Sequence, residues 1–126
     1  MRPNPSALVV DDNAINRNLL DGILRRIGWT AILCEGGEQA LQTLREQTFD
    51  LVLLDLRMPG LSGIETCRRI RSELGLARLP VVAYTAHGML EDRDRMLADG
   101  FNGMLIKPVS IADVKAVCAE FGPAPE

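Results

Sequence analysis

The sequence predicts an α/β fold in which a five-stranded parallel sheet carries helices on both faces. Short apolar segments alternate with longer amphipathic segments along the chain. The clearest of the short segments are continuously apolar, which is typical of strands that are buried on both faces. Five strand-helix units in this regular order indicate a doubly wound (βα)5 domain, and 126 residues are the length of one domain.

The expected strands are the short apolar segments. They comprise residues 7–10, 29–34, 51–54, 80–84 and 103–106. Right-handed crossovers leave few topologies, and we expect the flavodoxin-like strand order 2-1-3-4-5. This order reverses between the first and third strands. Folds of this kind bind ligands there, at the carboxyl ends of the strands.

The expected helices carry apolar residues at helical spacing, and glycine follows three of them as a stop signal. The apolar positions are Ile15, Leu19, Ile23 and Ile27 before Gly28; Ala40, Leu41 and Leu44 after Gly36 and Gly37; Ile64, Cys67, Ile70 and Leu74 before Gly75; Met89, Met96 and Leu97 before Gly100; and Ile111, Val114, Val117, Cys118 and Phe121. We expect one folded domain over residues 6–121, with 1–5 and 122–126 as linker or tail.

The composition argues against several kinds of function. The net charge is -3 and no basic stripe is visible, so we expect no binding of nucleic acid. Cys34, Cys67 and Cys118 lack disulfide or zinc spacing, which favours buried thiols in a reducing cytoplasm. Neither a signal peptide nor a membrane-spanning run is visible, so we expect a cytoplasmic chain without direct membrane contact. Trp29, at the start of the second strand, is expected to be partly exposed.

Acidic residues gather at the expected ligand-binding edge. Asp11 and Asp12 end the first strand, and Asp55 ends the third. Asp12 or Asn13 taken alone would be explained as a helix N-cap. Three acids at one point repel one another, which raises their pKa values unless a cation lies among them. Oxygen ligands with room for water suit Mg²⁺ or Mn²⁺ and do not suit zinc.

Two further polar residues end strands at the same edge. Thr85 ends the fourth strand and Lys107 the fifth. An ammonium group, a hydroxyl and a metal around one carboxylate are what phosphoryl transfer to that carboxylate needs. Each of these residues alone is usually structural. Together with the acids they predict an aspartyl phosphate.

Four motifs resemble those of response regulator receiver domains. They are Val9-Val10-Asp11-Asp12-Asn13, Asp55-Leu56-Arg57-Met58-Pro59-Gly60, Tyr84-Thr85-Ala86 and Lys107-Pro108. The resemblance covers nearly the whole chain and implies that Asp55 is the phosphoacceptor. It further implies that Asp12 and Asp55 bind Mg²⁺ directly. Asp11 would act through water, and the backbone carbonyl of Arg57 would be another ligand.

The same resemblance assigns the residues that hold the phosphoryl group. Thr85 and the amide of Ala86 would bind its oxygens, and Lys107 would pair with it. The bond between Lys107 and the proline after it is expected to be cis. Arg57 and His87 flank the expected phosphoryl position, which makes them candidates for setting how fast water removes the group. An exposed loop histidine is an equally open interpretation of His87.

The run from Asp12 to Arg17 resembles the start of receivers attached to hybrid histidine kinases. The implied partner is a histidine kinase or a histidine phosphotransferase, and fusion to a kinase core is one arrangement that the resemblance implies. It would act as a phosphoacceptor that regulates a partner or an attached kinase. It would not be an enzyme, although it would assist its own phosphorylation and dephosphorylation. We expect a monomer.

One position departs from the family pattern. Receivers commonly have an aromatic residue three positions before the lysine, where it swings inward on phosphorylation, and this chain has Met104. Tyr84 stands beside Thr85, but strand alternation points it to the opposite face. The sequence therefore leaves the route from phosphorylation to conformational change open.

Two alternatives remain from other functional classes. A haloacid-dehalogenase-like phosphatase also uses Asp, Thr, Lys and Mg²⁺, but it needs a second acid two residues after the nucleophile, where this chain has Arg57. A pseudo-receiver would have the fold without phosphorylation, and the presence of all the chemical residues argues against it. A phosphate-trapping assay distinguishes this second alternative.

Overall fold

The computed structural model of the chain describes residues 4–86 and 90–123, and these form the predicted α/β architecture. Its strands are β1 (Ser6–Val10), β2 (Thr30–Cys34), β3 (Leu51–Asp55), β4 (Val81–Thr85) and β5 (Gly103–Ile106). Its helices are α1 (Ala14–Arg26), α2 (Gly37–Glu46), α3 (Gly63–Ser72), α4 (Leu90–Ala98) and α5 (Ile111–Phe121). Each predicted strand boundary is confirmed to within one residue. Met89, which contributed to the prediction of the fourth helix, lies outside the described residues.

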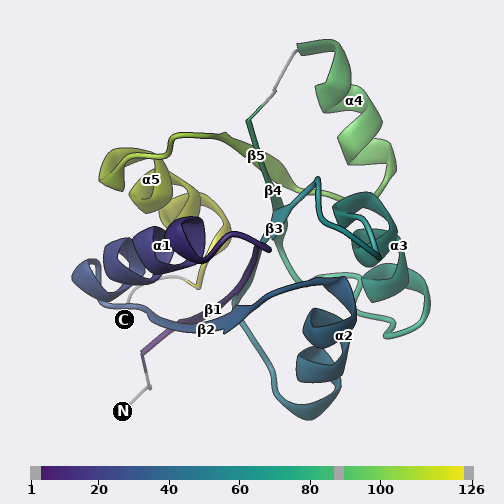
Figure 1. Cartoon of the computed structure of the whole chain (residues 1–126), viewed down its shortest axis with the longest axis horizontal. Helices are drawn as coiled ribbons and strands as arrows, with labels where there is room; N and C mark the ends of the chain where they lie inside the picture. Colours follow the sequence, from purple (N-terminus) through teal and green to yellow (C-terminus); the bar gives the residue numbers. More distant parts are fainter. Residues whose placement is uncertain (1–3, 87–89, 124–126) are drawn as a thin grey trace.

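The sheet is parallel throughout and has the predicted order β2-β1-β3-β4-β5. Helices α1 and α5 cover one face, and α2, α3 and α4 lie on the other side (Figure 1). Because all strands run in the same direction, their carboxyl ends lie at one edge of the sheet. The order reverses where β1 pairs with β3, so the residues after Val10 lie beside those at the end of β3.

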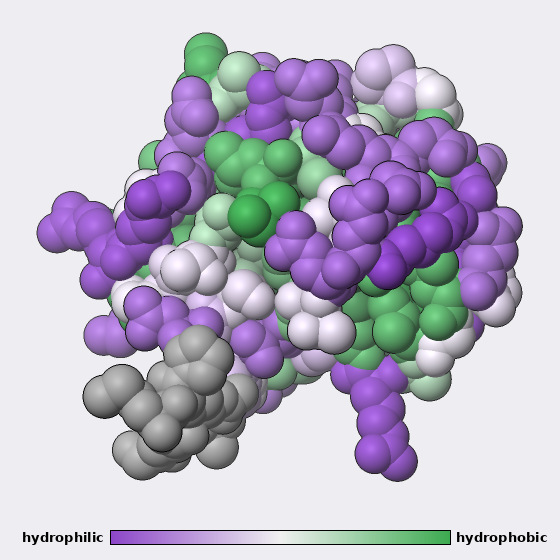
Figure 2. Space-filling model, turned by 90° about the horizontal axis from the view of Figure 1, so that it is seen from below, coloured by the Kyte–Doolittle hydropathy of each residue, from purple (hydrophilic) through white to green (hydrophobic). Residues whose placement is uncertain are grey.

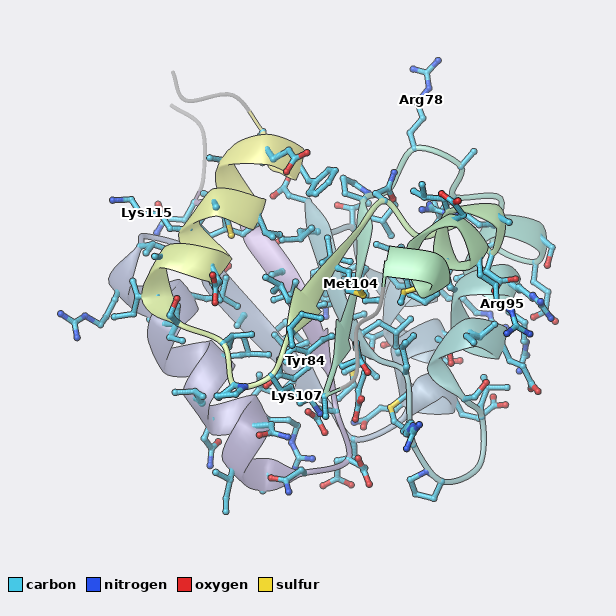
Figure 3. The ribbon with its side chains drawn as sticks, turned by 90° about the horizontal axis from the view of Figure 1, so that it is seen from above. Arg78, Tyr84, Arg95, Met104, Lys107 and Lys115 are labelled. Carbon is cyan, nitrogen blue, oxygen red and sulfur yellow. The ribbon has the colours of Figure 1, made fainter. Side chains whose placement is uncertain are left out.

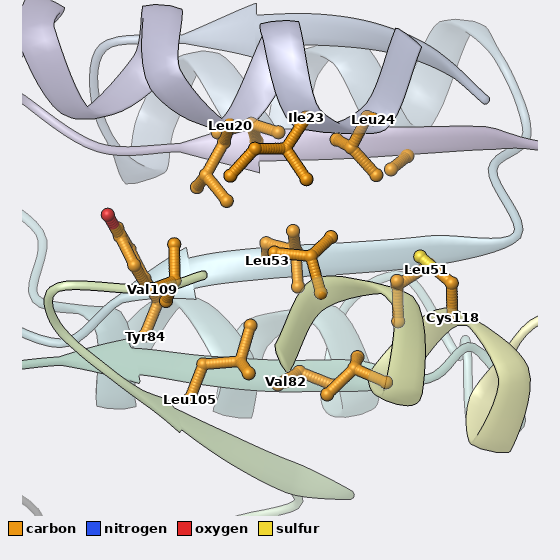
Figure 4. Packing of buried hydrophobic residues seen from close by; sticks show 14 of the residues in the cluster. Leu20, Ile23, Leu24, Leu51, Leu53, Val82, Tyr84, Leu105, Val109 and Cys118 are labelled. Atoms are coloured by element: carbon orange, nitrogen blue, oxygen red, sulfur yellow. The ribbon is translucent and has the colours of Figure 1, made fainter. Parts of the chain in front are cut away.

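Each face of the sheet has its own hydrophobic cluster. The cluster under α1 and α5 includes Leu20, Leu53, Tyr84 and Leu105 (Figure 4), and we call it the α1/α5 core. Val114 of α5 also belongs to it. The α2/α3 core, on the opposite face, includes Leu8, Leu41, Leu54, Ile70 and Met96. Cys34 and Cys67 lie in the α2/α3 core and Cys118 in the α1/α5 core. All three are buried free thiols, as predicted.

The first helix is confirmed, but only part of its predicted apolar stripe faces the sheet. Leu20, Ile23 and Leu24 are buried against it. Ile15 and Leu19 are 78% and 44% exposed, although both have helical spacing to Ile23. Two apolar stripes at the same period overlap on this helix. The spacing that predicts a helix therefore does not determine which stripe is buried.

The expectation for Trp29 is wrong, because this side chain is only 8% exposed. Gly28 has a positive φ of 89°, and the turn there brings the Trp29 amide to within 2.9 Å of the Leu24 carbonyl oxygen, to which it donates. The indole then packs into the α1/α5 core. A Cβ atom at Gly122 would lie 2.6 Å from the indole ring, so the start of the expected tail packs directly on it.

The surface around β2 and α2 mixes polar and apolar side chains. Figure 2 shows hydrophobic areas on this side that are separated by a band of hydrophilic residues. The large exposed apolar residues are scattered over several elements and include Ile32 on β2 and Leu97 on α4. None of the helices that the structure describes is long and apolar enough to cross a lipid bilayer.

Candidate functional site

Three carboxylates meet at the carboxyl edge of the sheet, as the sequence predicts. Asp11 and Asp12 follow β1, and Asp55 is the last residue of the adjacent strand β3. One oxygen from each lies within 4.8 Å of the others. Asp11 and Asp55 are buried, whereas Asp12 is exposed. The pairing of β1 with β3 therefore places two of the acids inside the protein and one at its surface.

A cleft opens above these acids. Its volume is about 250 Å³, and its floor and walls come from the ends of several strands. The lining residues are Asp11, Asp12, Asn13, Asn16, Asp55, Arg57, Thr85, Ala86 and Lys107. The structure thus brings together every predicted site residue at this edge except His87, which lies outside the described residues.

Lys107 supplies a positive charge between the two buried acids. Its ammonium nitrogen Nζ lies 3.3 Å from Asp11 Oδ2 and 3.4 Å from Asp55 Oδ2. The Lys107 backbone amide donates to the Thr85 carbonyl oxygen at 2.8 Å, which fixes the start of the side chain beside β4. The bond to Pro108 is cis, as expected. Figure 3 shows Lys107 at this end of the strands, close to Tyr84.

The surroundings of Asp55 raise the pKa of its carboxyl group to about 6. Burial is the largest cause, and the negative charge of Asp11 adds to it. Lys107 and a hydrogen bond from the Arg57 amide, 3.3 Å from Asp55 Oδ1, act in the opposite direction. Asp55 is therefore a carboxylate whose negative charge is only partly compensated by the protein.

The remaining predicted residues stand on the rim. Thr85 is the last residue of β4 and is buried, and Ala86 follows it at the mouth of the cleft. Arg57, two residues after Asp55, lines the cleft from the loop before α3. Residues from β4, from the segment after it and from the loop after β3 thus line the same space as Asp55.

The acid cluster fits a hard divalent cation. Asp11 Oδ1 accepts from the Asn13 amide at 2.9 Å, but Asp11 Oδ2 accepts no hydrogen bond from any described residue and is fully buried. A buried carboxylate oxygen without a hydrogen bond is costly unless positive charge compensates it. The available donors are carboxylate and carbonyl oxygens, which Mg²⁺ prefers. Lys107 provides part of the compensation and leaves oxygens of all three acids facing the cleft.

The two residues that bear on the conformational switch lie on opposite faces. Met104 packs against the α2/α3 core, the face to which the alternation along β4 and β5 also directs Thr85. Tyr84 lies in the α1/α5 core and is 1% exposed. The predicted orientation of Tyr84, away from Thr85, is confirmed.

The sequence did not predict the roles of three residues near the site. Arg17 Nη1 donates to the Asp11 carbonyl oxygen at 2.7 Å and so fixes the end of β1. A Cβ atom at Gly63 would collide with the Asp55 carbonyl oxygen, so only glycine allows α3 to begin there. The Tyr84 ring lies under Lys107 Nζ, with 4.5 Å between the nitrogen and the ring centroid. Strand alternation places Tyr84 on the correct face, but no spacing rule predicts this contact.

The sequence is similar to those of known proteins. The profile of the response regulator receiver domain family matches residues 7–119. The chain is 35% identical, over an alignment of 131 positions, to the sensor protein GacS of Pseudomonas syringae pv. syringae. It is 40% identical over 114 residues to the sensor histidine kinase RcsC of Salmonella typhi. These alignments cover 97% and 90% of the chain but only 14% and 12% of the relatives.

A solved structure extends the comparison to three dimensions. It is the receiver domain of the sensor histidine kinase PA1611 from Pseudomonas aeruginosa PAO1, crystallised with a magnesium ion coordinated in the active site cleft. The TM-score is 0.85 at 31% sequence identity. The match covers 94% of this chain and 97% of that domain.

Proposed function

Because the chain belongs to the response regulator receiver domain family, we propose that it accepts a phosphoryl group on Asp55 in a two-component phosphorelay. The observation that carries the proposal is the placement of the Asp55 carboxylate. It is buried at the floor of the cleft, 3.4 Å from the Lys107 ammonium group, with a raised pKa. A carboxylate that is incompletely compensated is suited to act as a nucleophile.

The reaction is a transfer between two nucleophiles. An oxygen of Asp55 forms the new bond to phosphorus as the bond from phosphorus to the donor's imidazole nitrogen breaks. The electron pair of the broken bond stays on that nitrogen. Lys107 pairs with the negative charge of the transferring group, and the Thr85 hydroxyl and Ala86 amide donate to its oxygens.

Asp11, Asp12, Asp55 and the backbone carbonyl of Arg57 would hold Mg²⁺, or Mn²⁺ in its place. The bound ion would supply positive charge against the phosphoryl oxygens. Support comes from the buried Asp11 Oδ2, which pairs with Lys107 but accepts no hydrogen bond from the described residues. Further support comes from the oxygen-only donor set and from the magnesium ion in the PA1611 receiver domain. Arg57 and His87 would set the access of water to the phosphorylated aspartate.

The donor would be a phosphohistidine on a histidine kinase or a histidine phosphotransferase. The chain spans only a small part of sensor kinases such as GacS and RcsC, which supports a receiver that is fused to, or works with, a kinase core. We expect it to act in the cytoplasm. Its role would be that of a phosphoacceptor that assists its own phosphorylation and dephosphorylation. We expect it to act as a monomer without binding nucleic acid.

Intact-mass spectrometry tests the proposal directly. The protein is incubated with acetyl phosphate or phosphoramidate, with Mg²⁺ or with EDTA. We expect a one-phosphoryl adduct only with Mg²⁺, and none in Asp55→Asn. The matched control is Asp21→Asn, which removes a carboxylate that pairs with Arg25 on the surface of α1. An adduct that persists in Asp55→Asn, or that forms equally in EDTA, would overturn the proposal, and its absence in the wild type would favour a pseudo-receiver.

A further inference from the structure

We propose that Tyr84 is a positioning residue for the phosphoryl transfer, because its ring face holds the Lys107 ammonium group over the acids. The inference rests on the proposed function, since it concerns how the catalytic lysine is kept in place. Lys107 Nζ lies 4.5 Å from the centroid of the Tyr84 ring while it faces Asp11 and Asp55. An ammonium group within about 6 Å of a ring centroid is attracted by the negative face of the ring.

The strands explain why these two side chains meet. Tyr84 on β4 pairs with Asp55 on one side and with Leu105 on the other. Side chains alternate along a strand, and Lys107 directly follows the last residue of β5, so the alternation directs it to the face of Leu105, which is also the face of Tyr84. Lys107 must then extend past the Tyr84 ring to reach the acids. Figure 3 shows the two side chains close together at this end of the sheet.

Tyr84 itself cannot act on the phosphoryl group from this place. It is 1% exposed and is not among the residues that line the cleft. Its ring belongs to the α1/α5 core, where it lies close to Val109 and Leu105 (Figure 4). This packing gives the ring a fixed orientation. The contact of the ring with the site is the one with Lys107, so we expect an effect of the ring on the chemistry to pass through this lysine.

The ring differs from the carboxylates in one important respect. The attraction of Asp11 and Asp55 for Lys107 depends on charges that a bound cation would share and that phosphorylation of Asp55 would change. The ring is neutral and keeps its quadrupole in every state of the site. Tyr84 is thus the partner that can hold a long, flexible lysine in the cleft throughout the reaction.

The test compares Tyr84→Phe, which keeps the ring, with Tyr84→Leu, which removes it. We measure phosphorylation by phosphoramidate at saturating Mg²⁺, because a small donor excludes effects on partner docking. Tyr84→Leu should react about three- to tenfold more slowly, the range of a partly desolvated cation–π contact, and Tyr84→Phe within about twofold of wild type. Val82→Ala, which truncates a buried neighbour on the same strand face, is the matched control and should leave the rate of the folded protein unchanged.

A double-mutant cycle separates positioning from general destabilisation. In a Lys107→Met background, Tyr84→Leu should cause no further loss, because the ring then has no ammonium group to hold. NMR of the Lys107 side chain gives a readout that is independent of activity. Its Hε protons should be shifted upfield by the ring current in wild type and Tyr84→Phe, and this shift should be absent in Tyr84→Leu. Tyr84→Met replaces the leucine variant if that variant does not fold.

Three results would overturn the inference. Tyr84→Phe could be as slow as Tyr84→Leu, the leucine penalty could persist without Lys107, or the wild-type Hε protons could lack the upfield shift. A wild type that accepts no phosphoryl group at all would instead refute the proposed function. The NMR comparison distinguishes the two failures, because the contact of ring and lysine would still be detected.

Discussion

Arg71 and Lys107 are cations at opposite ends of the same sheet, and they are held in different ways. Arg71, on α3, donates five hydrogen bonds of 2.6 to 3.1 Å to the carbonyl oxygens of Leu76, Leu79 and Gly100 and to Asn102 Oδ1. These acceptors precede β4 and β5, at their amino ends. Lys107, at the carboxyl ends, faces two carboxylates at 3.3 and 3.4 Å.

The difference separates a structural role from a chemical one. The acceptors of Arg71 are neutral. Three are backbone carbonyl groups, and the fourth, Asn102 Oδ1, also accepts from the Val81 amide at 2.9 Å. The partners of Lys107 are charges that an incoming cation and a phosphoryl group would redistribute. One end of the sheet therefore satisfies its polar groups within the protein. At the other end, the charges of the carboxylates are only partly compensated within the protein, as a binding site requires.

Replacing Lys107 should give the largest effect and should change the rate rather than the fold. We expect Lys107→Met to slow phosphorylation by phosphoramidate about 100- to 1,000-fold, because it removes a charge aimed at the transferring group. Lys115→Met is the control, since Figure 3 shows Lys115 on α5, away from the site. Intact-mass time courses measure both rates. A loss of less than about tenfold in Lys107→Met would place this lysine nearer to the structural type that Arg71 represents.

Replacing Arg71 should give the converse result. We expect Arg71→Met to lower the free energy of unfolding by about 3 kcal/mol, because several partly buried carbonyl groups lose their donor together. Arg78→Met should change it by less than about 0.5 kcal/mol, since Arg78 is exposed and extends from the protein in Figure 3. Urea denaturation measures both values. The phosphorylation rate of folded Arg71→Met should stay close to that of wild type, and a 100-fold loss would remove the distinction between the two ends.

In the absence of metal, the partly compensated charge of Asp55 should make the free energy of unfolding depend on pH. Its folded-state pKa of about 6 lies above the ordinary value of 3.8, so between these values the folded chain binds more protons than the unfolded chain. This contribution to stability is complete at pH below about 4 and is lost as the pH rises through 6. In EDTA at pH 7, Asp55→Asn should therefore be more stable than wild type by about 2 kcal/mol.

The difference between the two proteins should shrink as the pH falls and vanish below about pH 3, where Asp55 is protonated in both the folded and the unfolded chain. Thermal or urea unfolding in EDTA across this range measures it. Addition of Mg²⁺ at pH 7 should stabilise wild type more than Asp55→Asn. A stability difference that does not change with pH would mean that the effect of the substitution comes from packing and not from the charge of Asp55.

The comparison of the two ends also separates what the sequence predicts from what it does not. The acid cluster, Thr85 and Lys107 were predictable because parallel strands bring their carboxyl ends to one edge of the sheet. The position of a residue at the end of its strand is then enough to predict that it lies near the others. Arg71 was not, because its acceptors at Gly100 and Asn102 lie 29 and 31 residues away. The burial of Trp29 and the choice between Leu19 and Leu20 on α1 likewise depend on packing between distant elements, and a periodic pattern is compatible with either outcome.

We expect the smallest effect from replacing Met104, which lies within β5. Met104 borders a small cavity of about 50 Å³ together with Met96 and Phe101. Methionine is flexible and unbranched, so it can fill space vacated by Thr85 in several rotamers. An all-or-none switch needs an element with two discrete positions, which a methionine does not provide.

We therefore expect a graded response around Met104 when the site is filled. Backbone NMR shifts with and without beryllofluoride should change strongly at Thr85 and Ala86 and only weakly near Met104 and residues 109–116. Met104→Ala should lower the free energy of unfolding by only about 1 kcal/mol, since the side chain is half-buried, and should leave the phosphorylation rate within about twofold. Large two-state shifts near Met104 that survive Met104→Ala would show that the conformational change does not depend on this residue. The signal would then have to leave the site by another route, for which Lys107 and the Tyr84 ring in the α1/α5 core are the adjacent candidates.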